Sequence, residues 1–149
     1  MSEGKSYFID TARCTACRGC QVACKQWNQR AGEKTASLGT HQNPPDLSYN
    51  TWKLVRFSEV VGEKFSWYFF PDQCRHCIEV ADLKVKGAVM HDEATGAVIF
   101  SPKVKMKPAD FKEVREACPY DIPRFLPSAG IMAKCTMCFD RIKEGMLPA

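Results

Sequence analysis

The stretch CTACRGCQVACKQW, residues 14–27, decides the fold of this chain, because it sets four cysteines at spacings of three, three and four. The 149 residues contain 9 cysteines. An odd number cannot all form disulfides, and repeated C-x2-C pairs have a chain geometry that favours a shared metal over mutual bonding. The sequence therefore predicts metal binding, and the candidate ligands are Cys14, Cys17, Cys20, Cys24, Cys74, Cys77, Cys118, Cys135 and Cys138.

The spacing within the first group indicates which metal group is bound. C-x2-C-x2-C-x3-C is the spacing with which bacterial ferredoxins hold a 4Fe-4S cluster, and the fourth cysteine of such a run reaches a second cluster. In those small ferredoxins a proline follows the fourth cysteine, whereas here Lys25 follows Cys24 and the proline follows Cys118 instead. Zinc is the alternative, since the C-x2-C pairs at 74–77 and 135–138 could close one tetrahedral site. The pattern favours iron-sulfur clusters in an enlarged relative of the ferredoxins.

Composition excludes several classes of function. A hydrophobic content of 45% suits one compact domain, and the net charge of +4 comes from 21 scattered basic residues, which argues against nucleic acid as a partner. The longest apolar run, at 65–70, is far shorter than the roughly 20 residues of a membrane span, and residues 1–10 lack a signal pattern. No phosphate-binding loop or catalytic constellation is present. We therefore expect a protein that conducts electrons and carries out no bond-making chemistry of its own.

Periodicity predicts an α+β fold with short strands, short helices, a β-hairpin insertion and long loops. In the helix at 18–30, Val22, Ala23 and Trp27 are expected to face inward. The polar segment 28–50 reads as a long irregular insertion that contacts a partner, because so long a loop needs external contacts to be ordered. The other expected elements are a strand at 6–10, a hairpin from 51–60 and 64–70, a hairpin at 88–100, and a helix at 108–119 that ends at Cys118 and Pro119.

Several peptides resemble a known family, the iron-sulfur beta subunits of soluble tungsten- or molybdenum-containing formate dehydrogenases. These subunits belong to the ferredoxin-like electron-transfer subunits of molybdopterin oxidoreductases. The resemblance covers essentially the whole chain, and it is carried by DTARCTACRGCQVACKQWN (10–28), HQNPPD (41–46), FFPDQCRHC (69–77), HDEATGAV (91–98), ACPYDIPR (117–124) and AKCTMCFDRI (133–142). It implies a single ferredoxin-type domain over 1–149 with two intertwined cluster-binding halves.

The resemblance also implies a function. Such a subunit relays electrons through 4Fe-4S clusters between the molybdopterin site of a large catalytic subunit and an external acceptor such as a cytochrome. The resemblance implies a periplasmic location, which the chain reaches by export together with a signal-bearing partner. The cytoplasm is the alternative. Two other functions stay open: the beta subunit of a dimethyl sulfoxide or sulfur-compound reductase, and a zinc-stabilised module without redox function.

Three clusters are expected by resemblance, with three of the nine cysteines for each. One cluster takes Cys14, Cys17 and Cys20; a second takes Cys24, Cys135 and Cys138; and a third takes Cys74, Cys77 and Cys118. Each set is one thiolate short of four. We therefore expect a longer native polypeptide with three further cysteines, one soon after Cys77 and two beyond Ala149. The alternative is a divergent protein whose clusters are each held by three cysteines.

Charged side chains near the cysteines have two interpretations. A cation beside a cluster raises its reduction potential, because reduction adds negative charge, but a basic residue next to a cysteine can equally belong to a solvated surface. His76 lies between two candidate ligands and could donate to a sulfide or contact a partner, whereas His41 and His91 are expected to be structural. The basic residues in question are Arg13, Arg18, Lys25, Arg75, Lys134 and Arg141.

Overall fold

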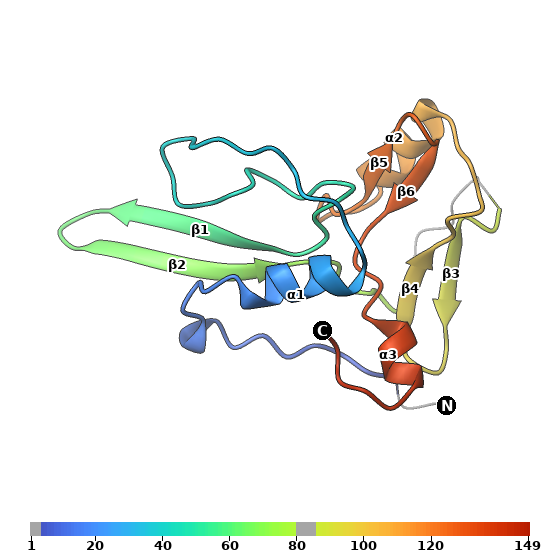
Figure 1. The fold of residues 1–149 in the computed structure, drawn as a ribbon, viewed down its shortest axis with the longest axis horizontal. Coiled ribbons are helices and arrows are strands. Elements are labelled where there is room, and N and C mark those ends of the chain that lie inside the picture. The colour runs from blue at the N-terminus through green and yellow to red at the C-terminus, as the bar shows by residue number, and fades with distance from the viewer. Residues whose placement is uncertain (1–3, 80–85) are drawn as a thin grey trace. The chain divides into compact units, whose positions relative to one another are not determined.

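The fold of residues 4–79 and 86–149 is described by a computed structural model. The chain divides into two compact units, one formed by Tyr7–Asp72 and the other by Met1–Ser6 together with Gln73–Ala149. Within the described residues, the strands form three separate two-stranded antiparallel sheets, joined by short helices and irregular segments (Figure 1). This confirms the predicted α+β class with short elements.

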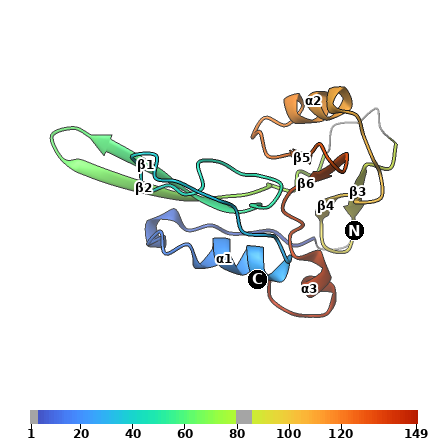
Figure 2. The ribbon, with the colours of Figure 1, turned by 45° about the horizontal axis from the view of Figure 1, so that its top comes forward.

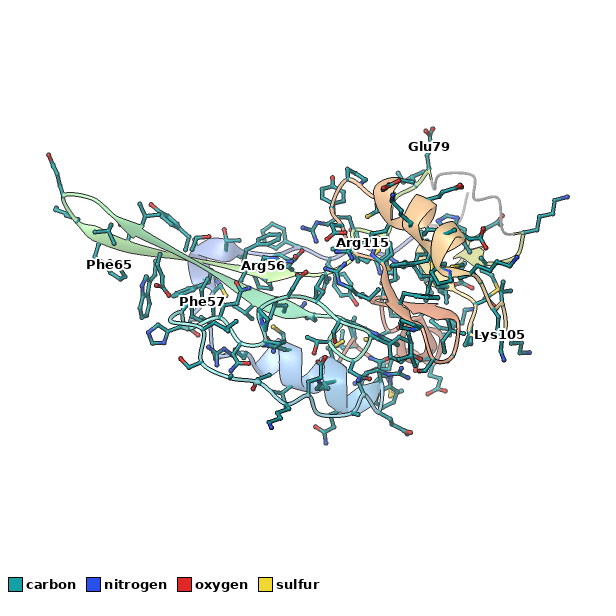
Figure 3. All side chains as sticks on the ribbon, turned by 90° about the horizontal axis from the view of Figure 1, so that it is seen from above. Arg56, Phe57, Phe65, Glu79, Lys105 and Arg115 are labelled. Atoms are coloured by element: carbon teal, nitrogen blue, oxygen red, sulfur yellow. The ribbon has the colours of Figure 1, made fainter. Side chains whose placement is uncertain are left out.

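A long hairpin dominates the unit Tyr7–Asp72. Strand β1 (Leu54–Val61) pairs with β2 (Phe65–Asp72), as the alternation of apolar and polar residues predicts. The two ends of the hairpin differ in burial. Leu54 is fully buried at the base, whereas Val61 is 83% exposed at the tip. The hairpin is therefore anchored at one end only, and the label of Phe65 marks its free end in Figure 3.

Aromatic side chains stabilise the exposed half of this hairpin. The ring of Trp67 lies 5.6 Å from that of Phe65 and 6.0 Å from that of Phe69, and Phe69 lies 5.1 Å from Phe57 across the strands, all edge to face. His41 adds a ring 4.9 Å from Trp67. A two-stranded hairpin is marginal on its own in water, and such aromatic pairs each contribute about 0.5–1.5 kcal/mol. The row of rings thus supports a strand pair with little other cover.

One helix packs against the base of the hairpin. Helix α1 (Gly19–Trp27) follows a 3-10 turn, η1 (Thr11–Arg13), and runs alongside the hairpin in Figure 2. The backbone N–H of Val55 donates to Oε1 of Gln21 at 3.2 Å, which fixes the helix to β1. The predicted helix is confirmed.

The predicted inward face of α1 is wrong. Val22 is 62% exposed and Trp27 is 38% exposed, whereas Cys24 is only 8% exposed. Residues four apart share a helix face, so burial of Cys24 turns the side that also carries Cys20 inward and leaves Val22 outside. The strand predicted at 6–10 is also wrong, because this segment has no strand partner.

The segment 28–50 is irregular, as predicted, and both of its ends are tied to its own unit. The ammonium of Lys25 pairs with Glu33 at 3.2 Å. Near the other end, Arg56 of β1 pairs with Asp46 at 2.8 Å. These contacts order the segment without a partner, so its length alone does not require one. Residues 34–41 lie between the two anchors and are exposed.

The second unit contains the other predicted hairpin. Strand β3 (Val89–Asp92) pairs with β4 (Ala97–Phe100). Gly96 closes the turn with a φ of 77°, a conformation that L side chains rarely adopt, and a Cβ there would meet the carbonyl oxygen of Lys5 at 3.5 Å. Three further elements of this unit were not predicted: β5 (Arg124–Leu126), β6 (Ile131–Ala133) and α3 (Phe139–Lys143).

The core of the second unit lies under helix α2 (Pro108–Glu116), which begins at a proline as predicted. Phe111 of this helix stacks on Phe125 of β5, with ring centroids 4.8 Å apart and planes inclined by 13°. The helix thereby covers the β5–β6 pair. The buried members of the core are Ala88, Met106, Val114 and Met132.

Replacement of Leu54 by alanine is expected to destabilise the protein. Leu54 is fully buried, and removing a buried leucine side chain loses both transfer free energy and packing. We expect the free energy of unfolding to fall by about 2–5 kcal/mol in urea denaturation followed by circular dichroism. Val61→Ala on the same strand is the control and should change it by less than about 0.5 kcal/mol, because Val61 is exposed. Equal effects of the two variants would contradict the burial gradient along the hairpin.

Candidate metal centre

The first cysteine group forms a tight loop between η1 and α1. Cys14 and Cys20 are partly exposed and Cys17 is exposed. Ala16 and Arg18, which separate these cysteines, have φ values of 55° and 61°. Two left-handed residues within five positions fold the chain back sharply, so the loop presents cysteines from a short, strongly curved stretch.

The same backbone conformation recurs in three of the four C-x2-C pairs. The third residue of the pairs at 14–17, 74–77 and 135–138 is left-handed: Ala16 has a φ of 55°, His76 of 49° and Met137 of 62°. None is glycine or asparagine, so each costs about 1–2 kcal/mol relative to a right-handed conformation. Strain of this kind concentrates at functional sites. Its recurrence at one position of one motif marks the three loops as the same kind of site.

The left-handed residues also point backbone donors at sulfur. The N–H of His76 donates to Sγ of Cys74 at 3.3 Å, and the N–H of Met137 donates to Sγ of Cys135 at 3.4 Å. A donor directed at sulfur stabilises a thiolate over a thiol, and the thiolate is the form that ligates metals. The backbone of these loops is therefore arranged for charged sulfur ligands.

Three cysteines from distant parts of the sequence line one cavity. The cavity has a volume of about 280 Å³, and Cys74, Cys77 and Cys118 all contribute to its wall. Cys118 arrives there because it follows the end of α2, where Pro119 prevents the helix from continuing. Much of the remaining wall is apolar, with Val98, Phe100, Val114, Ala117, Ile122 and Pro123. The fold thus brings together the three cysteines that the resemblance assigns to one cluster.

The remaining cysteines are the most buried ones. Cys24, Cys135 and Cys138 are 8%, 5% and 6% exposed. The side-chain amide of Asn28 lies 3.8 Å from Sγ of Cys24 as a donor. Cys24 belongs to the unit Tyr7–Asp72 and the other two to the second unit, so their sharing of one cluster stays a prediction.

His76 is buried and neutral. It is 7% exposed, and its Nδ1 accepts a hydrogen bond from the backbone N–H of Val98 at 3.0 Å. Burial, followed by the charges of Lys134 and His91, lowers the pKa of His76 to about 3. Because Nδ1 is an acceptor, the proton lies on Nε2, which has no hydrogen-bond partner among the described residues. His76 therefore lies beside the cysteines as a neutral donor.

The six basic residues near the cysteines differ sharply in burial. Arg13 and Arg75 are exposed, and Arg18, Lys25 and Arg141 are partly exposed. Lys134 is only 6% exposed and lines the cavity with Cys74, Cys77 and Cys118. The interpretation as solvated surface is thus wrong for Lys134, which is buried in the wall of the cavity that these cysteines line.

The position and chemistry of the cysteines fit an iron-sulfur cluster. Three of them line one cavity, and thiolate sulfur is the soft ligand that such clusters take. A tetrahedral zinc ion draws its sulfur ligands to about 2.3 Å from one centre, whereas a cubane spreads them around a larger body. The cavity between Cys74, Cys77 and Cys118 provides room for such a body, so the residues present fit a 4Fe-4S cluster.

Comparison with known proteins defines the class. Residues 65–149 match the family described as the 4Fe-4S dicluster domain, which is more than half of the chain. The protein is therefore an iron-sulfur protein of the ferredoxin-like dicluster class. This confirms the predicted ferredoxin-like fold and the 4Fe-4S chemistry, and it sets aside the zinc-stabilised module.

Relatives of known function define the family within this class. The chain is 52% identical to formate dehydrogenase subunit beta of Megalodesulfovibrio gigas, over 97% of this chain and 70% of the relative. It is 53% identical to formate dehydrogenase 2 subunit beta (cytochrome c-553) of Nitratidesulfovibrio vulgaris, over 97% and 69%, and 37% identical to the formate dehydrogenase-O iron-sulfur subunit of Escherichia coli, over 100% and 50%. The chain belongs to the family of iron-sulfur beta subunits of formate dehydrogenases, which are electron-transfer subunits.

The comparisons confirm the family that the peptides indicated and its place in a formate dehydrogenase complex. No described helix is long and apolar enough to cross a membrane. Sequence reasoning did not find the left-handed residues that share one position in three of the four C-x2-C pairs. It also gave no means of selecting Lys134 from the six neighbouring cations. The gap expected after Cys77 falls on 80–85, outside the described residues.

Proposed function

We propose that this chain relays electrons through three 4Fe-4S clusters within a formate dehydrogenase complex. The observation that carries the proposal is the cavity lined by Cys74, Cys77 and Cys118, because it gathers three thiols from two distant segments around a space that fits a cluster. When bound, such clusters take up and release single electrons. The proposed ligand sets are Cys14, Cys17 and Cys20; Cys24, Cys135 and Cys138; and Cys74, Cys77 and Cys118.

The chain's own residues hold each cluster and shape its surroundings. The backbone N–H groups of His76 and Met137 donate hydrogen bonds to Sγ of Cys74 and of Cys135. Such donors stabilise sulfur in the thiolate form that ligates iron. The cavity wall beside Cys118 is largely apolar, whereas Cys118 is partly exposed and Cys77 is exposed. Hydrogen bonds to sulfur and solvent exposure are two of the factors that set the reduction potential of an iron-sulfur cluster.

The partner we propose is a large molybdopterin subunit that contains tungsten or molybdenum and interconverts formate and carbon dioxide. The electrons then pass to an external acceptor, for which a cytochrome is the natural candidate, since the Nitratidesulfovibrio vulgaris relative carries cytochrome c-553 in its name. A periplasmic location, reached with a signal-bearing partner, follows from the family resemblance. These assignments rest on the relatives and on the absence of catalytic groupings from the sequence.

Metal analysis of the purified complex tests the cluster proposal. We expect this chain to contain iron and acid-labile sulfide in a ratio of about one to one, with broad brown visible absorption and negligible zinc. The separated beta chain should retain this absorption when it is handled without oxygen. Zinc at one or more per chain, with no iron, would overturn the proposal.

A second proposal concerns the contact with the large subunit. We expect residues 34–41, the exposed middle of the segment 28–50, to lie against the catalytic subunit. Amides buried by a partner exchange slowly with solvent, so hydrogen exchange there should be slower in the assembled complex than in the free beta chain. Residues 62–64, at the turn of the β1–β2 hairpin, are the reference for an exposed turn in the same unit. Equal exchange of 34–41 in both forms would contradict the contact.

A further inference from the structure

The charge of Lys134 is unusual because it is buried and has no ion-pair partner among residues 4–79 and 86–149. Its side chain is 6% exposed. Nζ donates to the backbone carbonyl oxygens of Val98 and, at 3.1 Å, of Cys135, and it lies 5.1 Å from the ring centroid of Phe100. Among the described residues, no carboxylate forms an ion pair with it. In the described part of the chain, Lys134 is thus held by carbonyl dipoles and by an aromatic ring face.

Such an arrangement is costly unless a negative charge lies nearby. Removing an ammonium group from water costs several kcal/mol, and carbonyl dipoles offset only part of this. Arg124 is another buried cation of this unit among the described residues. It forms an ion pair with Asp121 at 3.6 Å, so this buried charge is matched by a carboxylate. Lys134 has no equivalent, although the carboxylate of Glu79 lines the same cavity as an exposed group.

The cavity supplies the missing anion if it holds a cluster. Lys134 lines the cavity together with Cys74, Cys77 and Cys118. A 4Fe-4S cluster with four thiolates carries net negative charge and becomes more negative on reduction, so a fixed cation at its wall stabilises the reduced state more than the oxidised one. The effect is strong where the surroundings are apolar, because the effective dielectric constant is low there.

We infer that Lys134 is the buried counter-charge of the cluster held by Cys74, Cys77 and Cys118, and that it raises the reduction potential of this cluster. The inference rests on the proposed cluster site. Lys134 acts through its charge alone and does not ligate iron. It also links two cysteine motifs, because its backbone precedes Cys135 while its side chain reaches the wall of the other site.

Redox titration of the purified complex, followed by electron paramagnetic resonance, tests this inference. Loss of a signal in Cys118→Ser identifies the cluster concerned. We expect Lys134→Gln, which keeps donors for the two carbonyls and removes the charge, to weaken reduction of that cluster at least tenfold, a shift of about 59 mV for one electron. Lys134→Met should do the same, and Lys134→Arg should stay near the unmodified protein. Lys105→Met, at an exposed site in the same unit (Figure 3), is the control.

The outcomes separate the inference from the proposal on which it rests. An unchanged potential in Lys134→Gln, with the cluster present, overturns the inference and leaves the cluster site intact. If Lys134→Met does not assemble the cluster, Lys134→Gln and Lys134→Arg decide. A complex without iron, or a Cys118→Ser variant that loses no signal, overturns the cluster site itself. The shift should also persist at high salt, because a buried charge is screened less than an exposed one; a shift abolished by salt indicates a surface effect and contradicts the inference.

Discussion

Replacement of Cys118 by serine is expected to remove the cluster at Cys74 and Cys77 and to leave the others in place. The structure brings these three sulfur atoms to one cavity, so the variant deprives that site of one of the three thiolates that this chain provides. A serine hydroxyl is a poor substitute because soft thiolate sulfur is the ligand that iron-sulfur clusters prefer. Iron and acid-labile sulfide per chain should fall by about a third, since one of three proposed clusters is lost.

The matched control for this variant is Ala117→Ser. Ala117 lines the same cavity, so the substitution adds the same hydroxyl one residue away without removing a sulfur atom. Its iron content should equal that of the unmodified protein. Loss of iron in both variants would mean that the cavity does not tolerate a hydroxyl. Full retention of iron in Cys118→Ser would show that Cys118 is not a ligand.

Replacement of Cys24 by serine is expected to damage the cluster of Cys135 and Cys138 more than that of Cys14, Cys17 and Cys20. The fourth cysteine of a C-x2-C-x2-C-x3-C run ligates the other cluster in two-cluster ferredoxins. Cys24 also differs from the other three cysteines of the run in burial. Cys24 is 8% exposed, whereas Cys14, Cys17 and Cys20 are less buried. The expected result is loss of one complete resonance signal.

The assignment of that signal needs two reference variants. Cys17→Ser marks the first cluster and Cys138→Ser marks the second, so the signal lost in Cys24→Ser can be matched to one of them. Ala23→Ser, at the neighbouring position of α1, controls for a change in the helix itself. If Cys24→Ser loses only the signal that Cys17→Ser loses, the predicted crossing of Cys24 to the second cluster is wrong.

Much of the local structure followed from the sequence. The two longer hairpins and both nine-residue helices were predicted, because each hairpin is marked by local alternation and each helix by a helical pattern, with a proline at the start of α2. Strands β5 and β6 were missed because three residues are too few to show the alternation of apolar and polar side chains. The wrong face of α1 has a different cause, since the burial of Cys24 overrides the greater hydrophobicity of Val22 and Trp27.

The sequence by itself determined the chemistry of the protein. The number, type and spacing of the cysteines indicate soft sulfur ligation, and the run of four at 14–24 favours cubane clusters. This is so because ligand type and local spacing are properties of short stretches of chain. The peptides around the motifs carried the family for the same reason.

The tertiary structure showed which distant side chains line one cavity. Cys118 meets Cys74 and Cys77 because α2 ends at the wall of their cavity. Lys134 differs from five other cations only in its burial. Burial is the sum of contacts from many chain segments, and electrostatic strength depends on the water that those contacts exclude. Burial and electrostatic strength cannot be deduced from the residues next to a cysteine in the sequence. The tertiary structure therefore determines which charge lies in the wall of the cavity that the cysteines line.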